Sequence, residues 1–232
     1  MIHGGGWQNG DKSNRGFIEN KVPFFNENGY IAVSINYRLS PAIKHPAHIE
    51  DVAEAVAWIN KNINKYGGDK DKIFVMGHSA GAHLAALVAV DERRLKLHKL
   101  NLSAIKGVIL LDGAGYDVPT QMKGSEFFSG ILGDMYENAF TNDEAIQKDA
   151  SPLFQIKKGT NIPPFLIFTA GGRKASVSQS ENLVKALTKV GVKAQTFDDL
   201  DKNHMTINKQ FGLADEMITK KSKEFLAAIL KN

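Results

Sequence analysis

Hydrophobic and polar positions divide the chain into two kinds of segment. Short apolar runs, often β-branched, are typical of strands that a parallel sheet buries on both faces. Between them lie longer segments whose apolar residues recur at helical spacing. The runs predict strands at residues 30–37, 73–76, 105–111, 163–170 and 192–197. The longer segments predict helices at residues 16–28, 48–65, 80–90, 178–190 and 214–230. We therefore expect an α/β fold, a mostly parallel open sheet with helices on both faces.

One long segment interrupts this alternation. Residues 118–152 have no strand pattern but contain apolar side chains among polar ones: Phe127, Phe128, Ile131, Leu132, Met135, Tyr136 and Phe140. Such an insertion after a central strand forms either a small cap over a functional site or ordinary helices that face the core. We expect one domain over residues 1–232, with these two options open for the insertion at about 118–152.

The segment Gly77-His78-Ser79-Ala80-Gly81 lies between a predicted strand and a predicted helix. It matches G-x-S-x-G, a tight turn that holds a nucleophilic serine in an exposed position. Small residues are needed at positions 77 and 81 because the turn brings strand and helix together. The turn also places Ser79 at a helix N-terminus, where the Ala80 amide can face negative charge on a bound carbonyl oxygen.

A second motif, His-Gly-Gly-Gly-Trp at residues 3–7, matches the HGGG type of oxyanion loop. With these two motifs the chain resembles the α/β-hydrolase superfamily, specifically carboxylesterases of the hormone-sensitive-lipase-like and arylformamidase-like groups. The resemblance runs from residue 3 to the C-terminus. It implies an α/β-hydrolase fold in which Ser79 attacks the substrate and the amides of Gly5, Gly6 and Ala80 form the oxyanion hole.

The same resemblance makes the N-terminus unusual. An oxyanion loop of this kind should follow a buried strand, yet only Met1 and Ile2 precede the loop. We therefore expect the N-terminal strands of the fold to be missing. Either the chain is truncated, or a neighbouring chain fills the gap, as in a homodimer.

A serine hydroxyl needs an imidazole to take its proton as it attacks a carbonyl. The superfamily places this base after the nucleophile and the acid, just beyond the last strand, where His204 lies. We therefore expect His204 to be the base. His78 and His83 flank Ser79 in the sequence, but side chains within such a turn point elsewhere, and His3 is expected to brace its own loop.

The acid that completes the triad is absent where the resemblance places it. In the resembling esterases it lies in the loop after the strand at 163–170, and Ala175 is the best-matching position here. Either Ala175 marks an introduced or natural loss of the acid, or the acid has moved to Asp117, Asp199 or Asp201. Of these we favour an empty position at Ala175, which would leave Ser79 poorly activated.

Composition narrows the classes of function. The formal net charge is +4, but the lysines are dispersed, which argues against a nucleic-acid-binding face. Cysteine is absent, so disulfides and thiolate metal ligands are excluded. His45 and His48 are close enough in sequence for a metal pair but lack acidic or thiol companions, so we expect structural roles for them and no metal or cofactor. With no apolar run of membrane-spanning length and no leader pattern, we expect a cytoplasmic protein.

The expected activity is hydrolysis of a short-chain or aryl carboxylic ester through an acyl-serine intermediate, impaired if the acid is lacking. A small-molecule ester would be the substrate, and no cofactor would be required. Two alternatives remain: an arylformamidase-like amide hydrolase, and a catalytically silent protein that keeps the fold and binds a ligand in the old pocket.

Overall fold

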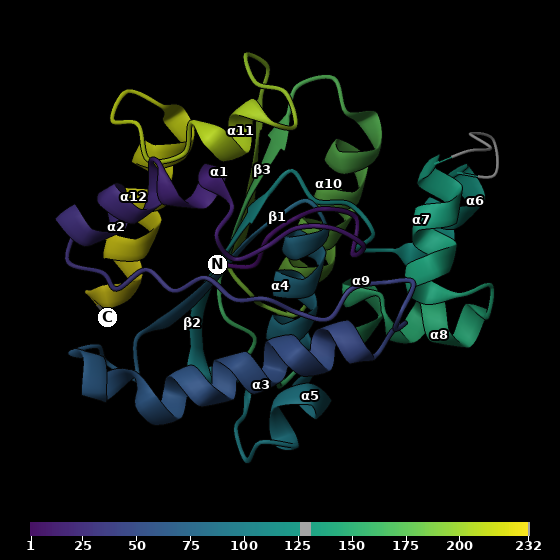
Figure 1. Ribbon diagram of the computed structural model, residues 1–232, viewed down its shortest axis with the longest axis horizontal. Coiled ribbons are helices and arrows are strands. Elements are labelled where there is room, and N and C mark those ends of the chain that lie inside the picture. The colour runs from purple at the N-terminus through teal and green to yellow at the C-terminus, as the bar shows by residue number, and fades with distance from the viewer. Residues whose placement is uncertain (126–130, 232) are drawn as a thin grey trace.

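The computed structural model describes residues 1–125 and 131–231, and its centre is a parallel four-stranded sheet (Figure 1). The strands pair in the order β1-β2-β3-β4, and every pair is parallel. Their bounds are β1 (Ile73–His78), β2 (Ile105–Leu111), β3 (Phe165–Ala170) and β4 (Ala194–Asp199). The expected α/β architecture is thereby confirmed. Because all strands run the same way, their carboxyl ends lie along one edge of the sheet.

Successive side chains of the strands enter two separate hydrophobic cores, because side chains alternate between the faces of a sheet. Val108 and Leu110 of β2 belong to one core, whereas Ile109 and Leu111 belong to the other. The first core includes residues from α3 (Ala47–Asn62), α4 (Ala80–Val90) and α10 (Lys174–Lys189). The second includes residues from α2 (Lys21–Glu27), α11 (Thr206–Lys209) and α12 (Met217–Leu230). Helices therefore cover both faces, as expected.

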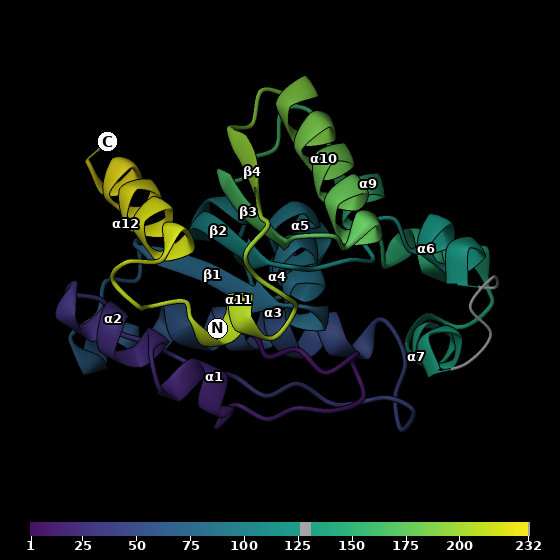
Figure 2. The same ribbon diagram turned by 90° about the horizontal axis from the view of Figure 1, so that it is seen from above.

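The insertion after β2 folds into short helices beside the sheet. They are α6 (Val118–Ser125), α7 (Ile131–Phe140), α8 (Glu144–Asp149) and α9 (Pro152–Gln155). In both views α6 and α7 stand to one side of the sheet (Figures 1 and 2). Phe140 is buried, and its ring lies 4.7 Å from that of Trp7 in the loop at residues 3–7. Phe127 and Phe128 lie outside the described residues.

Two predicted helices differ from the observed ones, and one observed helix was not predicted. The helix expected at 16–28 is two helices, α1 (Arg15–Ile18) and α2, and Pro23 lies near the start of α2, where its missing N–H is tolerated. The helix that the pattern did not predict is α5 (Glu92–Lys96), whose first turn is capped by the Asp91 side chain. Helix α10 begins at Lys174, four positions before the predicted start at Ser178, so Ala175 is helical.

The segment 30–37, predicted as a strand, is extended chain with one β-bridge at Ile35. Its neighbour is Ile2, which lies between Ile35 and Gly77 and forms parallel bridges with both. The Met1 ammonium donates to the Val33 carbonyl at 2.7 Å, and burial lowers its pKa to about 5. The isolated bridge follows from this arrangement, because a ladder needs more than one residue of a neighbouring strand.

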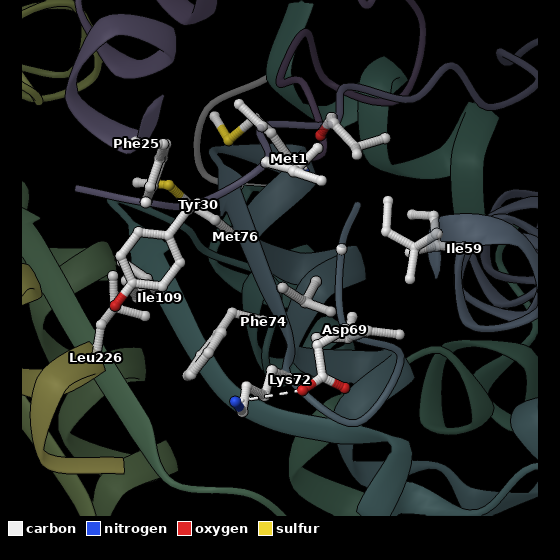
Figure 3. A pocket seen from close by; sticks show the side chains of 18 of the residues that line it. Met1, Phe25, Tyr30, Ile59, Asp69, Lys72, Phe74, Met76, Ile109 and Leu226 are labelled. Atoms are coloured by element: carbon white, nitrogen blue, oxygen red, sulfur yellow. Dashed lines mark hydrogen bonds and ion pairs between the residues drawn. The ribbon is translucent and has the colours of Figure 1, made fainter. Parts of the chain in front are cut away.

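An apolar cavity of about 390 Å³ lies between the segment 30–33 and β1. Figure 3 shows Met1 at one end of it, with Tyr30, Phe74, Met76 and Leu226 around it. Of the first two residues, Met1 lines this cavity. The expected homodimer stays a prediction. Among the residues described, no helix combines the length and the apolar character needed to cross a bilayer.

Lys21 is a fully buried cation at the start of α2. Its ammonium donates to the carbonyl oxygens of Gly16 and Asn208, and so ties α2 to the helix that follows His204. It also lies 5.6 Å from the centre of the Phe211 ring. Burial lowers the pKa of Lys21 to about 7, because desolvation disfavours the charged form.

This pKa predicts a pH dependence of stability. Between about pH 7 and the ordinary lysine value the unfolded chain binds a proton that the folded chain does not. The free energy of unfolding therefore rises with pH, by at most about 1.4 kcal/mol per pH unit. Urea unfolding of wild type and Lys21→Met from about pH 8 to 9.5 should show a steeper rise for wild type. The exposed Lys209→Met on α11 serves as the control and should behave as wild type. Equal slopes for wild type and Lys21→Met would contradict the low pKa.

Candidate active site

Ser79 lies in the sharp turn that joins β1 to α4, as the G-x-S-x-G motif predicted. Its backbone has φ +56°, an uncommon conformation for a residue other than glycine. The turn is tight: a Cβ at Gly77 would lie 2.0 Å from the Gly81 carbonyl oxygen, and a Cβ at Gly81 would lie 2.2 Å from the Ile2 carbonyl oxygen. Both positions therefore require glycine, and the serine is held in a strained, well-defined place.

The side chains of Ser79, His204 and Asp112 form one hydrogen-bonded chain. His204 lies in the loop between β4 and α11, and its Nε2 is 3.0 Å from the Ser79 hydroxyl. Its Nδ1 is 2.6 Å from Oδ2 of Asp112. In the tautomer that satisfies both contacts, Nδ1–H donates to the carboxylate and Nε2 accepts from the hydroxyl. This is the arrangement of a nucleophile, a base and an orienting acid.

Asp112 follows β2 directly and is almost fully buried. Its Oδ1 accepts from the Ser176 hydroxyl at 2.6 Å and from the Ala170 amide at 3.3 Å, while Arg173 contacts its Oδ2 beside His204. Burial raises the pKa of Asp112, but the hydrogen bonds from His204, Ser176 and Arg173 outweigh it and bring the pKa well below its ordinary value. The carboxylate is therefore ionised at neutral pH and can stabilise a positive charge on His204.

The expectation of a missing acid is corrected by this geometry. Ala175 does offer no carboxylate, and it lies in the first turn of α10 at the rim of the pocket. The carboxylate that reaches His204 is that of Asp112, which was not among the three candidates. Asp117 instead accepts from the Thr120 amide and hydroxyl. The Asp199 side chain accepts from the Asp201 amide, and no contact of either residue with His204 is recorded among the described residues.

The predicted oxyanion residues lie at two sides of the serine. Gly6 and Ala80 line the same pocket as Ser79, whereas Gly5 is not among its lining residues. Instead the Gly5 carbonyl accepts from the Gln8 and Asn9 amides, which closes a turn in the loop. Gly5 and Gly6 have φ +118° and +62°, so the loop uses conformations that favour glycine. Their part in an oxyanion hole stays a prediction, and Gly6 and Ala80 are better placed for it than Gly5.

Trp7 fixes the end of this loop through a histidine that the sequence did not single out for this role. The Trp7 indole donates to Nδ1 of His83 at 3.2 Å, and His83 Nε2 donates to the Ala150 carbonyl at 2.8 Å. The contact with Trp7 requires an unprotonated Nδ1 and therefore a neutral ring, and burial lowers the pKa of His83 to about 3. His3 braces the other end, as expected, because its ring stacks on Tyr37 at 4.4 Å between ring centres.

His78 contacts the backbone of His204, the predicted base. Its Nε2 donates to the His204 carbonyl at 2.8 Å, and the two rings lie 4.5 Å apart. Burial lowers the pKa of His78 to about 3, so it stays neutral and does not compete for the serine proton. His78 therefore positions the backbone of the base, which its place beside Ser79 in the sequence did not reveal.

Ser79 lines a pocket of about 420 Å³. It is lined by Gly6, Trp7, Ser79, Ala80, Asp112, Ala114, Thr120, Gln121, Met135, Tyr136, Arg173, Ala175, Ser178 and Gln179. Met135 and Tyr136 come from α7, so the insertion contributes part of the wall. Whether it acts as a cap stays a prediction.

His45 and His48 have separate structural partners. His45 contacts the Asp149 carboxylate at 2.8 Å, and His48 contacts the Ser40 hydroxyl at 2.9 Å. Within residues 1–125 and 131–231, no group of three or more His, Cys, Asp or Glu side chains is placed to hold a metal ion. His45 therefore has an acidic partner that its sequence neighbourhood did not reveal, and each histidine connects its own segment to a residue elsewhere in the fold.

The sequence and the fold of this chain are similar to those of known proteins. Residues 1–187 match the BD-FAE family model. Esterase LipQ of Mycobacterium tuberculosis is 31% identical over 210 residues, which cover 88% of this chain and 49% of LipQ. Kynurenine formamidase of Meyerozyma guilliermondii is 33% identical over 140 residues, or 59% of this chain and 50% of that enzyme. The chain thus spans about half the length of these curated relatives.

Solved structures agree on the fold. Esterase B from Lactobacillus rhamnosis superimposes with a TM-score of 0.78 at 21% identity, covering 99% of this chain and 76% of that one. The Pyrobaculum calidifontis esterase has a TM-score of 0.71 at 25% identity, with 99% of this chain and 74% of that one covered. The expected α/β-hydrolase fold is thereby confirmed.

The position of the acid can be tested by two substitutions. Asp112→Asn keeps the shape of the side chain but removes its charge and favours the wrong His204 tautomer. We expect kcat for p-nitrophenyl acetate to fall by about two to four orders of magnitude. Ala175→Asp should leave kcat/KM unchanged or lower, because the acid position is already filled.

Asp117→Asn is the matched control, since it neutralises a nearby carboxylate that does not touch His204. It should retain wild-type kcat, with melting temperatures showing that all three variants fold. A large gain in Ala175→Asp, together with full activity in Asp112→Asn, would restore the interpretation of an empty acid position.

Proposed function

Because the chain belongs to the BD-FAE family, we propose that it is a serine carboxylesterase that hydrolyses small esters through an acyl-serine intermediate. The observation that carries this proposal is the hydrogen-bonded chain from the Ser79 hydroxyl through His204 to Asp112. Such a chain serves no packing purpose that simpler residues could not serve, whereas it is what a nucleophilic serine requires. The hydrogen-bonded chain therefore favours an active hydrolase over a catalytically silent protein that only binds a ligand.

The first half of the reaction acylates the serine. As the Ser79 oxygen attacks the ester carbonyl carbon, its proton passes to Nε2 of His204. The imidazolium that forms is stabilised by the ionised Asp112. The carbonyl oxygen gains negative charge, which the amides of Gly6 and Ala80 would stabilise at the start of α4. Collapse of the tetrahedral intermediate breaks the bond to the alcohol, which leaves with the proton from His204.

The second half returns the enzyme to its starting state. A water molecule gives a proton to Nε2 of His204 and attacks the acyl carbon. The acyl–oxygen bond to Ser79 then breaks, and the serine oxygen recovers a proton from the imidazolium. The net reaction is ester plus water to acid plus alcohol, and it uses only groups in the described site.

The size of the pocket supports small substrates. A volume of about 420 Å³ is in the lower part of the range for small-molecule sites. Trp7, Met135 and Tyr136 supply apolar wall, which suits a short acyl or aryl group. The names of relatives such as esterase LipQ support ester over amide hydrolysis, and the same triad chemistry would extend to the formamide bond of the kynurenine formamidase relative.

The proposal is tested by covalent labelling and burst kinetics. A fluorophosphonate probe should label wild type at Ser79, as located by peptide mass spectrometry. The wild type should also release p-nitrophenol from p-nitrophenyl acetate, with a burst if deacylation is the slow step. Ser79→Ala should lose labelling and turnover while keeping the wild-type melting temperature, because alanine removes only the hydroxyl.

Ser178→Ala is the matched control, because it removes another hydroxyl that lines the same pocket. It should label and turn over as wild type does. A folded wild type that neither labels nor hydrolyses ester would overturn the proposed function. Persistent activity in Ser79→Ala would place the nucleophile elsewhere.

A further inference from the structure

Arg173 is a cation at the edge of the triad, between β3 and α10. Its Nη1 contacts Oδ2 of Asp112 and lies beside Nδ1 of His204, and it is 3.4 Å from the Asp112 carbonyl oxygen. One arm of the guanidinium is thereby anchored to the carboxylate. This contact holds the guanidinium next to the triad, where Arg173 lines the Ser79 pocket.

Among residues 1–125 and 131–231, no hydrogen bond from the other guanidinium nitrogens of Arg173 to the protein is found. A guanidinium carries five N–H donors, and every contact recorded for Arg173 within residues 1–125 and 131–231 involves Nη1. The side chain is 41% exposed and lines the same pocket as Ser79. A guanidinium that is held at one nitrogen and has unpaired donors at the others is suited to bidentate binding of a second acceptor, such as a carboxylate.

The charges around the pocket favour an anionic partner. Asp112 and Arg173 are the charged residues among those that line it. The Asp112 side chain is fully buried, and its oxygens are engaged by His204, Ser176, Ala170 and Arg173. The accessible charge is therefore the positive one of Arg173. Uncharged polar side chains that line the pocket include those of Thr120, Gln121, Ser178 and Gln179.

We propose that Arg173 binds a carboxylate carried by the substrate, so that the preferred substrates are esters with a free acid group, such as monoesters of short dicarboxylic acids. This inference rests on the proposed esterase function and names its substrate class. The carboxylate would lie on the free side of the guanidinium while the ester carbonyl lies at Ser79.

A bound carboxylate would affect the chemical step as well as binding. His204 becomes cationic as it takes the serine proton, and the guanidinium beside Nδ1 opposes that charge. An anion on Arg173 offsets part of the opposing charge when the imidazolium forms. The advantage of a charged substrate should therefore appear in kcat as well as in KM.

The test compares charged and neutral esters of similar size. One arm places the charge on the acyl side, with p-nitrophenyl hemiglutarate against p-nitrophenyl pentanoate. The other places it on the alcohol side, with 3-acetoxybenzoate against phenyl acetate. In at least one arm Arg173→Gln should lower the charged-to-neutral ratio of kcat/KM by about tenfold or more, as expected for loss of a charge-assisted hydrogen bond.

Two further variants separate substrate binding from a structural effect. Arg173→Lys keeps the charge but not the fork, and should recover part of the ratio. Lys174→Gln removes the neighbouring exposed cation, which does not line the pocket, and should leave the ratio unchanged. A fall in kcat for both esters at a constant ratio would assign Arg173 to the positioning of Asp112 alone and overturn the inference.

Calorimetry with glutarate tests the same site without turnover. Wild type and Lys174→Gln should bind glutarate about tenfold or more tightly than Arg173→Gln does. Equal affinities in all three proteins would overturn the inference. If the neutral esters are hydrolysed, but neither the charged-to-neutral ratio of kcat/KM nor the glutarate affinity changes in Arg173→Gln, the inference fails and the proposed function stands. If no ester is hydrolysed but glutarate binding depends on Arg173, the esterase proposal fails and the anion site stands.

Discussion

The hydrogen bond between Asp112 and His204 is the constraint on which the site depends. It joins Asp112, which follows β2, to His204 in the loop beyond β4. Ser79, which follows β1, is hydrogen-bonded to the same imidazole. A parallel sheet makes this meeting possible, because its strands deliver their carboxyl ends to one edge. The hydrophobic cores on both faces therefore serve the site indirectly, since they fix the register that brings three distant residues together.

Around Ser79, His204 and Asp112, two neutral histidines form hydrogen bonds that hold the neighbouring backbone and the loop at residues 3–7 in place. His78 donates to the backbone of His204, and His83 connects Trp7 to the Ala150 carbonyl in the insertion. Burial keeps both rings uncharged, so they act as fixed donors and acceptors. The loop at residues 3–7 is thereby connected to α4, the helix that begins after Ser79.

Much of this could be predicted from the sequence. Ser79, its flanking glycines and the loop at 3–7 are local motifs, and His204 was predicted from the resemblance, because the superfamily places its base just beyond the last strand. The acid could not be found that way, because its identity depends on which side chain at the sheet edge reaches the imidazole. Ala175 was chosen by its place in a presumed loop, yet α10 already begins at Lys174. The signal that was missed is that Asp112 immediately follows a strand adjacent to β1.

The most direct measurement is the NMR spectrum of the His204 Nδ1 proton in protein labelled with ¹⁵N-histidine. A hydrogen bond to an ionised, buried carboxylate should give a strongly downfield, slowly exchanging resonance that couples to Nδ1. The account predicts that this resonance is present in wild type, survives in Asp117→Asn and disappears in Asp112→Asn. Its persistence in folded Asp112→Asn would contradict the account, because another group would then be holding the base.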